Sequence, residues 1–522
     1  MTQDLLPTLG YAAPALLMAA AAALAWRPAA GPGPLWRTQL GLSALAGVAA
    51  LLGAVQRPDL PLLGGWCRAT PLGTLLALLV QGLGTVITAY SARYLEGEPA
   101  QRRYLGALAG VLAAVQTLLL ADRWPLLIAA WSLTGLALQP LLCFYADRPF
   151  ARLAAHKKRL ADLLADGLLV LAAALCWRDL GTASLSALGA EIAARGMTPG
   201  LQWSAAALVL AVALRSALMP VHGWLTQVME APTPVSALLH AGVVNLGGYV
   251  LIRLAPLLEG AAPARALLLG LGLGTAVLAG LVTMTRVSIK VRLAWSTLAQ
   301  MGFMLLECAL GLYSLAALHL LGHSLYKAQA FLAAAGDVRR QRAQQLYRAP
   351  APAAASLWLA PAAAIATVLA LQALAARAGL AGWPWWWSAL LGLAWAPLLW
   401  LPGGPEGRAL RWRLAGSGLL MLVGLTAAAL LGHALPLGLR DAPREPLGLA
   451  ALLGMALLHG GIAALQKHRD ALDAWRRWSY AGFYLDEAYT RLALRLWPTR
   501  WAPPIRTRPA DARSGRAGAF TS

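Results

Sequence analysis

Two histidines and a lysine recur at a regular spacing in the segment HLLGHSLYK. His319, His323 and Lys327 are each four residues apart, so in a helix of 3.6 residues per turn they lie on one face. Imidazole titrates near physiological pH, and two such rings in line with an amine could pass protons. Two alternatives stay open: buried structural hydrogen bonding, or a zinc pair, for which no third ligand is close in sequence. The spacing favours a proton or ion path.

A second group of polar residues surrounds a proline in the segment LRSALMPVHGWLTQVMEAPTP. Arg215, His222 and Glu230 all lie close to Pro220. Proline removes a helical hydrogen bond and frees a carbonyl group, and broken helices at membrane depth are where transporters build ion sites. Pro220 alone would indicate only a kink. Together with these neighbours, it favours an ion site.

One further histidine, His240, lies inside the apolar run that follows. Pro232 and Pro234 mark the start of a new helix, because proline is tolerated in a helix's first turn. A lone histidine is commonly a buried residue with satisfied hydrogen bonds. Given its company, we expect His240 to lie in the bundle between the elements that carry Arg215 and Lys327.

Besides Glu230, three further acidic residues fall inside or at the edge of apolar segments. Asp162 and Asp166 follow the basic run HKKR and either contribute to an ion path or pair with Lys157 or Lys158 at the membrane interface. Glu307 stands alone in FMLLECALG, where a protonated acid with a single hydrogen bond fits as well as a functional one. A charge at a helix centre costs roughly 2.5–3.5 kcal/mol, so such residues are functional candidates by default.

The elements that must position these residues are membrane-spanning helices. The chain has 522 residues, of which 59% are hydrophobic and only 12% charged, with mean hydropathy +0.61; soluble domains carry about 25% charged residues. Backbone groups in lipid must be satisfied internally, which predicts an all-α polytopic protein in a lipid bilayer. The expected spans are 7–28, 38–56, 73–92, 104–121, 124–144, 161–178, 203–222, 234–255, 265–285, 291–310, 313–335, 355–376, 384–402, 412–432 and 446–465.

The net charge of +21 is explained by membrane topology. Lys and Arg concentrate in one set of alternate loops, which includes residues 148–159 and 339–348, and in the C-terminal tail. By the positive-inside rule this side is cytoplasmic, with the N-terminus outside. The first residues lack a basic n-region, so we expect residues 7–28 to be a retained span. Nucleic-acid binding is excluded as the explanation of the charge.

Little in the sequence indicates enzyme chemistry by this chain. The four cysteines are scattered without a CxxC pattern, so we expect neither a disulfide framework nor a metal site. No Gly-rich phosphate loop follows a strand. Residues 466–500 are expected to form an amphipathic helix on the membrane surface, and residues 501–522 to be disordered.

The segment RSALMPVHGWLTQVMEAPTPVSALLHAGVV (residues 215–244) resembles the central motif of the proton-translocating antiporter-like subunits of respiratory complex I and Mrp antiporters. SIKVRLAWSTLAQMGFM and the stretch 319–337 are similar to the motifs that follow in the same order. The resemblance covers about residues 75–340. It implies two inverted five-helix repeats with broken helices, here 104–255 and 265–402. Further transmembrane helices would flank them at 1–103 and 412–465, giving about 13–15 in all.

The resemblance also implies roles for residues at matching positions. Arg215 stands at the family's broken-helix lysine and His240 at a central histidine, while His319, His323 and Lys327 stand at the central relay of the second half. The family's span-five glutamate is replaced by Ser132, and arginine effectively never deprotonates. The segment 395–402 carries no lysine or glutamate at the second helix break.

With these departures and the tail GFYLDEAYTRLALRLWP, the chain resembles one branch of the family, the membrane subunits of bacterial inorganic-carbon accumulation complexes. That resemblance implies a chain in the bacterial inner membrane that conducts H⁺ or Na⁺. It also implies a cytoplasmic partner that resembles β-type carbonic anhydrase and carries the zinc for CO₂ hydration, with no cofactor in this chain. Two alternatives remain: an antiporter-like subunit of a complex I, Mrp or hydrogenase-type assembly, and a passive membrane anchor.

Overall fold

The computed structural model describes residues 5–26, 31–56, 58–346, 352–403, 408–467, 473–499 and 501. Within these ranges, 12 helices are long and apolar enough to cross a membrane, and two shorter apolar helices accompany them, Pro199–Arg215 and Trp385–Leu399. The chain is therefore a multi-pass helical membrane protein, as its composition predicts.

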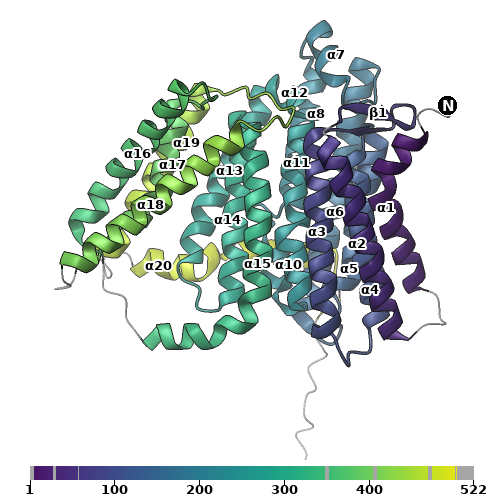
Figure 1. The fold of residues 1–522 in the computed structure, drawn as a ribbon, viewed down its shortest axis with the longest axis horizontal. Helices are drawn as coiled ribbons and strands as arrows, with labels where there is room; N and C mark the ends of the chain where they lie inside the picture. Colours follow the sequence, from purple (N-terminus) through teal and green to yellow (C-terminus); the bar gives the residue numbers. More distant parts are fainter. Residues whose placement is uncertain are drawn as a thin grey trace, which may run out of the picture.

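The N-terminal part is a bundle of long helices with a small hairpin at one end (Figure 1). The hairpin pairs β1 (Leu60–Leu62) with β2 (Cys67–Ala69) in antiparallel register, and the short helix η1 (Leu63–Gly65) makes the turn. The helices of this part are α1 (Leu5–Ala25), α2 (Pro32–Gln56), α3 (Pro71–Tyr94), α4 (Gln101–Leu120), α5 (Trp124–Leu142), α6 (Pro149–Leu180), α7 (Leu188–Arg195) and α8 (Pro199–Arg215).

The middle of the chain is a series of short helices with breaks between them. α8 ends at Arg215 and the next helix starts at Gly223, so Pro220 lies in the break. Pro232 and Pro234 stand at the start of the helix that carries His240, as predicted. These elements are α9 (Gly223–Gln227), η2 (Val228–Glu230), α10 (Thr233–Ala241), η3 (Val243–Asn245), α11 (Leu246–Arg253) and α12 (Ala255–Glu259).

The remaining helices form the second half and the tail. The tail is two short helices joined by a 3-10 turn, where one amphipathic helix over 466–500 was expected; residues 502–522 lie outside the described part. The elements are α13 (Ala262–Thr283), α14 (Ile289–Leu310), α15 (Tyr313–Leu346), α16 (Ala354–Arg377), α17 (Trp385–Trp395), η4 (Ala396–Leu399), α18 (Arg408–His433), α19 (Glu445–Lys467), α20 (Asp473–Tyr480), η5 (Gly482–Tyr484) and α21 (Leu485–Leu496).

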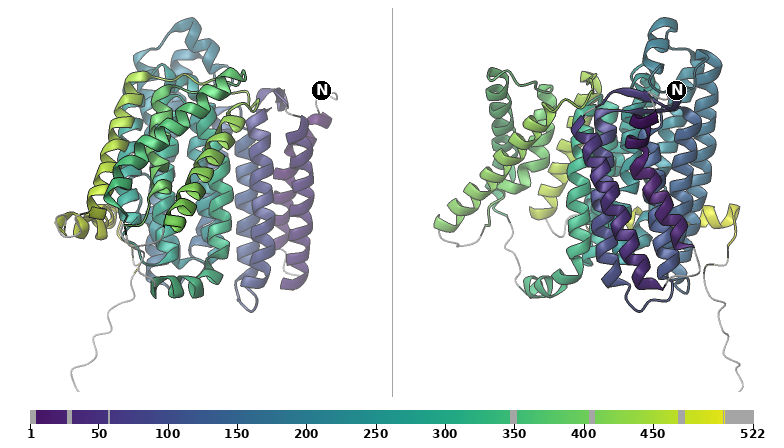
Figure 2. Two further views of the ribbon diagram at one scale, coloured as in Figure 1. Left: turned by 60° about the vertical axis from the view of Figure 1, so that its left-hand side comes forward. Right: turned by 45° about the vertical axis from the view of Figure 1, so that its right-hand side comes forward.

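The two ends of the bundle carry different elements. The start of α1, the hairpin, α7 and α12 lie at one end, which we call the N-terminal face (Figure 1). α20 and α21 lie toward the other end, the tail face, where the first turns of α6 contact α21. α16–α19 form a tilted group at one side of the bundle (Figure 2), where α19 packs on α13 and α14.

Helices in the centre pack closely because glycines face each other. A Cβ atom on Gly302 of α14 would lie 2.6 Å from the backbone of α13 at Gly272 and Ala276. Small residues let membrane helices approach in this way. α10 and α11 run through the middle of the bundle, and 94% of the residues in their most apolar 18-residue stretch are buried. α11 packs on α8 and α10 packs on α15, so this pair connects the two halves.

Each of the fifteen expected spans coincides with a helix or a broken pair of helices. Two boundaries differ in ways that affect the site. α6 begins at Pro149 rather than near 161, which places Lys157 and Lys158 inside the helix. The expected span 203–222 stops at Arg215, because the chain leaves helical geometry before Pro220.

Candidate ion-translocation site

An ion pair between a buried arginine and a partly exposed aspartate lies at the first helix break. Arg215, at the C-terminal end of α8, is 4% exposed and donates a hydrogen bond to the carboxylate of Asp166 on α6. It donates a second to the carbonyl oxygen of Trp131 at 2.6 Å, and the Ser132 hydroxyl donates to Asp166 at 2.6 Å. Asp166 therefore supplies, from α6, a carboxylate beside the broken helix, whereas the position at which the resemblance implies a family glutamate is Ser132 in this chain.

Two more charges continue this arrangement along α6. Lys158 donates hydrogen bonds to Asp162 one turn away, and both side chains are buried. The pairing alternative for Asp162 is thus what the structure shows, inside the bundle rather than at the interface. Asp162 also contacts α5 closely, because a Cβ atom on Gly135 would lie 2.6 Å from the Asp162 carboxylate. Lys158, Asp162 and Asp166 share the four-residue spacing of the histidine–lysine motif.

The motif itself forms a column along α15. His319 Nδ1 lies 3.0 Å from Glu307 Oε2 on α14, so Glu307 has a titratable partner. The rings of His319 and His323 meet edge to face, with centroids 6.1 Å apart. Lys327 is buried and donates to Ser296 and to the carbonyl oxygen of Leu293 at 3.1 Å. A carboxylate, two imidazoles and an amine therefore follow one another through the second half.

His240 lies beside this column, between the two halves. Its ring is fully buried and stacks on Phe331 of α15 with centroids 4.6 Å apart. Neither ring nitrogen of His240 or of His323 has a hydrogen-bond partner among the described residues. A buried polar group without a partner costs about 1–3 kcal/mol. Four such nitrogens in one region are expected where water or a passing ion supplies the missing contacts.

A cavity gives access to the column. Its volume is about 720 Å³, and it lies between α14, α15 and the group α17–α19. Glu307, His319 and His323 lie on its wall, and the rest of the lining is mostly apolar, including Trp387 and Trp395. The titratable groups therefore border open space within the second half.

Two of the predicted residues lie nearer the tail face than the Arg215 pair. His222 is buried in the break, with its ring centroid 5.1 Å from that of Trp295. Glu230 does not join the buried groups: its side chain is 41% exposed and lies 3.4 Å from Arg148, which is 45% exposed. An exposed pair of this kind contributes little to stability, and the place of Glu230 in an ion path stays a prediction.

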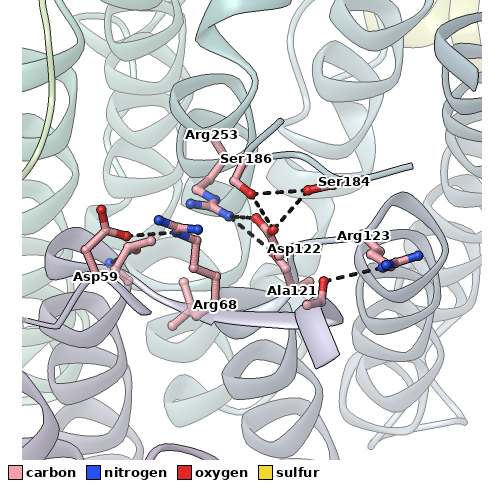
Figure 3. Close-up of polar contacts among 12 residues, drawn as sticks. Asp59, Arg68, Ala121, Asp122, Arg123, Ser184, Ser186 and Arg253 are labelled. Carbon is pink, nitrogen blue, oxygen red and sulfur yellow. Dashed lines mark hydrogen bonds and ion pairs between the residues drawn. The ribbon is translucent and has the colours of Figure 1, made fainter. Parts of the chain in front are cut away.

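A charged cluster on the N-terminal face was missed in the sequence (Figure 3). Asp122, between α4 and α5, is buried and accepts hydrogen bonds from Arg253 at 2.8 Å, Ser186 at 2.6 Å and Ser184 at 3.2 Å. Arg253 ends α11, so this cluster ties the end of the central helix to two loops. Because Asp122 accepts hydrogen bonds from three side chains of other segments, it is best explained as a structural contact that holds these segments together.

Another missed contact lies on the tail face. Lys157 of α6 is fully buried, and its amine lies 2.6 Å from the carboxylate of Asp486 on α21. These residues are far apart in the sequence, and the only hint was a basic run directly preceding an apolar segment. As for metals, no group of three or more His, Cys, Asp or Glu side chains gathers in the part of the chain that the structure describes.

Comparison with known proteins places this arrangement in context. The family model described as NADH:quinone oxidoreductase/Mrp antiporter, TM, matches residues 121–396. The chain is 39% identical over 467 residues to a probable inorganic carbon transporter subunit DabB of Hydrogenovibrio crunogenus, covering 86% of this chain and 87% of that one. A DabB2 subunit of Halothiobacillus neapolitanus is 45% identical over 284 residues, 54% of this chain and 52% of the relative.

A solved structure shows the same fold. The Mrp complex from a Dietzia species contains a chain that superposes with a TM-score of 0.57 at 24% identity. The superposition covers 94% of this chain and 56% of the Mrp chain. The antiporter-like architecture expected from the motifs is therefore confirmed.

Proposed function

The chain belongs to the DabB family, within the NADH:quinone oxidoreductase/Mrp antiporter group, and from this premise we propose that it is the cation-conducting membrane subunit of an inorganic-carbon transporter. The cation, H⁺ or Na⁺, would move down its gradient through the bundle. The energy released would drive a DabA-like cytoplasmic partner that resembles carbonic anhydrase, holds the zinc and hydrates CO₂ to bicarbonate. This chain would supply the coupling and carry out no hydration itself.

The observation that carries the proposal is the buried column of Glu307, His319, His323 and Lys327 beside a cavity. A passive anchor has no reason to bear the desolvation cost of these groups. Imidazole and amine nitrogens can each bind and release a proton. The column is thus suited to passing a proton, or to exchanging charge with a passing cation.

The two halves would have different tasks. Arg215 keeps its charge at all physiological pH values, so the Arg215–Asp166 pair would set the electrostatic field at the first break. Lys327 and the histidines would carry the exchange. We place the tail face in the cytoplasm and the N-terminal face outside, in the bacterial inner membrane, because the basic loops and the tail fall on one side.

The test is a growth and uptake assay. The chain is expressed with and without its partner in a carbonic-anhydrase-deficient bacterium in air, and labelled inorganic carbon is followed with and without an uncoupler. We expect uptake that needs both proteins and collapses with the uncoupler. If the assembled pair gives no uptake while vesicles show Na⁺/H⁺ exchange, the antiporter-subunit function replaces this one.

A further inference from the structure

The C-terminal segment enters the first helix break. The Asp486 carboxylate lies directly against the backbone of Gly223, in the break. A Cβ atom built on Gly223 would be 1.3 Å from Asp486 Oδ1. The other carboxylate oxygen, Oδ2, accepts a hydrogen bond from Gln227 at 2.9 Å. α21 is therefore docked into the bundle at the break between α8 and α10.

The contact is built around one buried cation. Lys157 donates to Asp486 at 2.6 Å and to the Thr490 hydroxyl at 3.0 Å, and its side chain is fully buried. Both partners belong to α21, and no hydrogen bond from the Lys157 amine to another element is found among the described residues. A buried charge needs a hydrogen-bonded counter-charge, so Lys157 stays buried only while α21 is in place.

Two further contacts hold α21 on α6. The Tyr489 hydroxyl donates to the Lys157 carbonyl oxygen at 3.4 Å, and burial raises the pKa of that phenol to about 12, so it remains a donor. His156 Nε2 lies 3.0 Å from the Trp497 carbonyl oxygen. Apolar contacts add to these polar ones, because Leu485 at the start of α21 packs against the core and Ala493 is buried. Among all of them, the bond between Lys157 and Asp486 joins two opposite charges.

Charges on α6 continue from this contact toward the middle of the membrane. Lys157 pairs with Asp486, the next residue Lys158 pairs with Asp162, and Asp166 pairs with Arg215. These three ion pairs form a polar series through the first half. The pair between Lys157 and Asp486 is its end on the tail face. Removing α21 would expose Lys157 there and open that end.

We propose that Lys157 and Asp486 form a gate at the tail-face end of the first half of the cation path, in which the C-terminal segment supplies the movable carboxylate. The gate is closed in this structure. Withdrawal of α21 opens it, and a cytoplasmic partner that binds α20 and α21 would thereby control cation entry. This inference rests on the proposed cation conduction.

The experiment separates docking from conduction. The whole chain is purified as wild type and as Asp486→Asn, Gly223→Ala and Glu487→Gln. The second variant leaves the carboxylate intact but fills the space it occupies, and the third removes an exposed carboxylate next to Asp486 on the same helix. Hydrogen exchange over residues 223–230 and 485–496 reports docking, and cation flux into vesicles containing the chain without its partner reports the gate.

We expect Asp486→Asn and Gly223→Ala to accelerate exchange in both segments and to raise cation leak by about tenfold, which corresponds to 1.4 kcal/mol, while Glu487→Gln matches wild type. Exchanging the pair, with Lys157→Asp and Asp486→Lys, should bring the leak back toward wild type. Faster exchange without any leak would overturn the gate, and so would unchanged exchange. Neither the hydrogen-exchange result nor the leak result depends on carbon uptake. A failure of carbon uptake would contradict the proposed function and would leave the docking measurement valid.

Discussion

Asp166 on α6 accepts a hydrogen bond from Arg215, so the carboxylate beside the first broken helix comes from a helix other than α5. Ser132, at the position where the family resemblance places a glutamate, donates to the same carboxylate. Arg215 therefore has a carboxylate partner in the first half of the chain, and this partner lies on α6.

This relationship predicts a rescue. Asp166→Ala should lower carbon uptake by about tenfold or more, because it leaves the buried Arg215 charge unpaired, at a cost of about 3–5 kcal/mol. Adding Ser132→Glu returns a carboxylate to the same guanidinium and should restore part of the uptake. Glu191→Gln is the matched control, because it removes a partly exposed carboxylate of α7 that pairs with Arg195. Uptake is measured at equal amounts of folded complex; a double variant no better than Asp166→Ala would contradict the pairing.

A second prediction concerns proton release by Lys327. Lys327→Arg keeps the positive charge but cannot deprotonate, and Lys327→Met removes the charge. Both should lower uptake by about tenfold or more, since loss of a proton-transfer group commonly costs 10²–10⁴ in rate. Tyr326→Phe, a change at the exposed neighbour, should leave uptake unchanged. Full activity of the arginine variant would show that Lys327 acts only as a fixed charge.

A third prediction treats Glu307 and His319 as one unit. Because the two side chains are in contact, the effects of Glu307→Gln and His319→Asn on uptake should not add. The double variant should be about as impaired as the worse single one. Independent, multiplying losses would mean that the two residues serve different steps.

The cluster on the N-terminal face predicts a change in stability with little change in transport. Asp122→Asn should lower the free energy of unfolding by about 1–3 kcal/mol, because Arg253 loses its charged partner. Asp59→Asn breaks the neighbouring exposed pair with Arg68 and should cost less than about 1 kcal/mol. Thermal melting of the purified chain compares them, and equal melting temperatures would contradict the structural role of Asp122.

Hydrophobic periodicity was sufficient to predict the helices but not the pairing of charges between them. The spacing of His319, His323 and Lys327 predicted one face correctly, because the period of a helix is local information. Arg215 and Asp166 are 49 positions apart in the sequence and lie on different helices. Neither sequence interpretation of Asp166, an ion path or a pair with Lys157 or Lys158, named Arg215 as its partner. Pairing across a bundle depends on which faces meet, and this is not encoded in spacing.

The tail shows a second limit. Its amphipathic pattern predicted a helix on the membrane surface, and a helix docked against other helices has the same pattern. The contact between Lys157 and Asp486 shows that α21 is docked on α6, and the position of the tail on the membrane surface stays a prediction. Glu230 is a related case: its proximity to Pro220 in sequence suggested a place in the ion site, and the structure puts its side chain in an exposed pair with Arg148.

The most direct test of the account measures gradient-driven carbon accumulation in vesicles that hold the purified two-protein complex. An imposed inward gradient of H⁺ or Na⁺ should drive accumulation of labelled bicarbonate in wild type and not in Lys327→Met. Accumulation that is equal in the two, or that proceeds without any gradient, would contradict a cation path through Lys327.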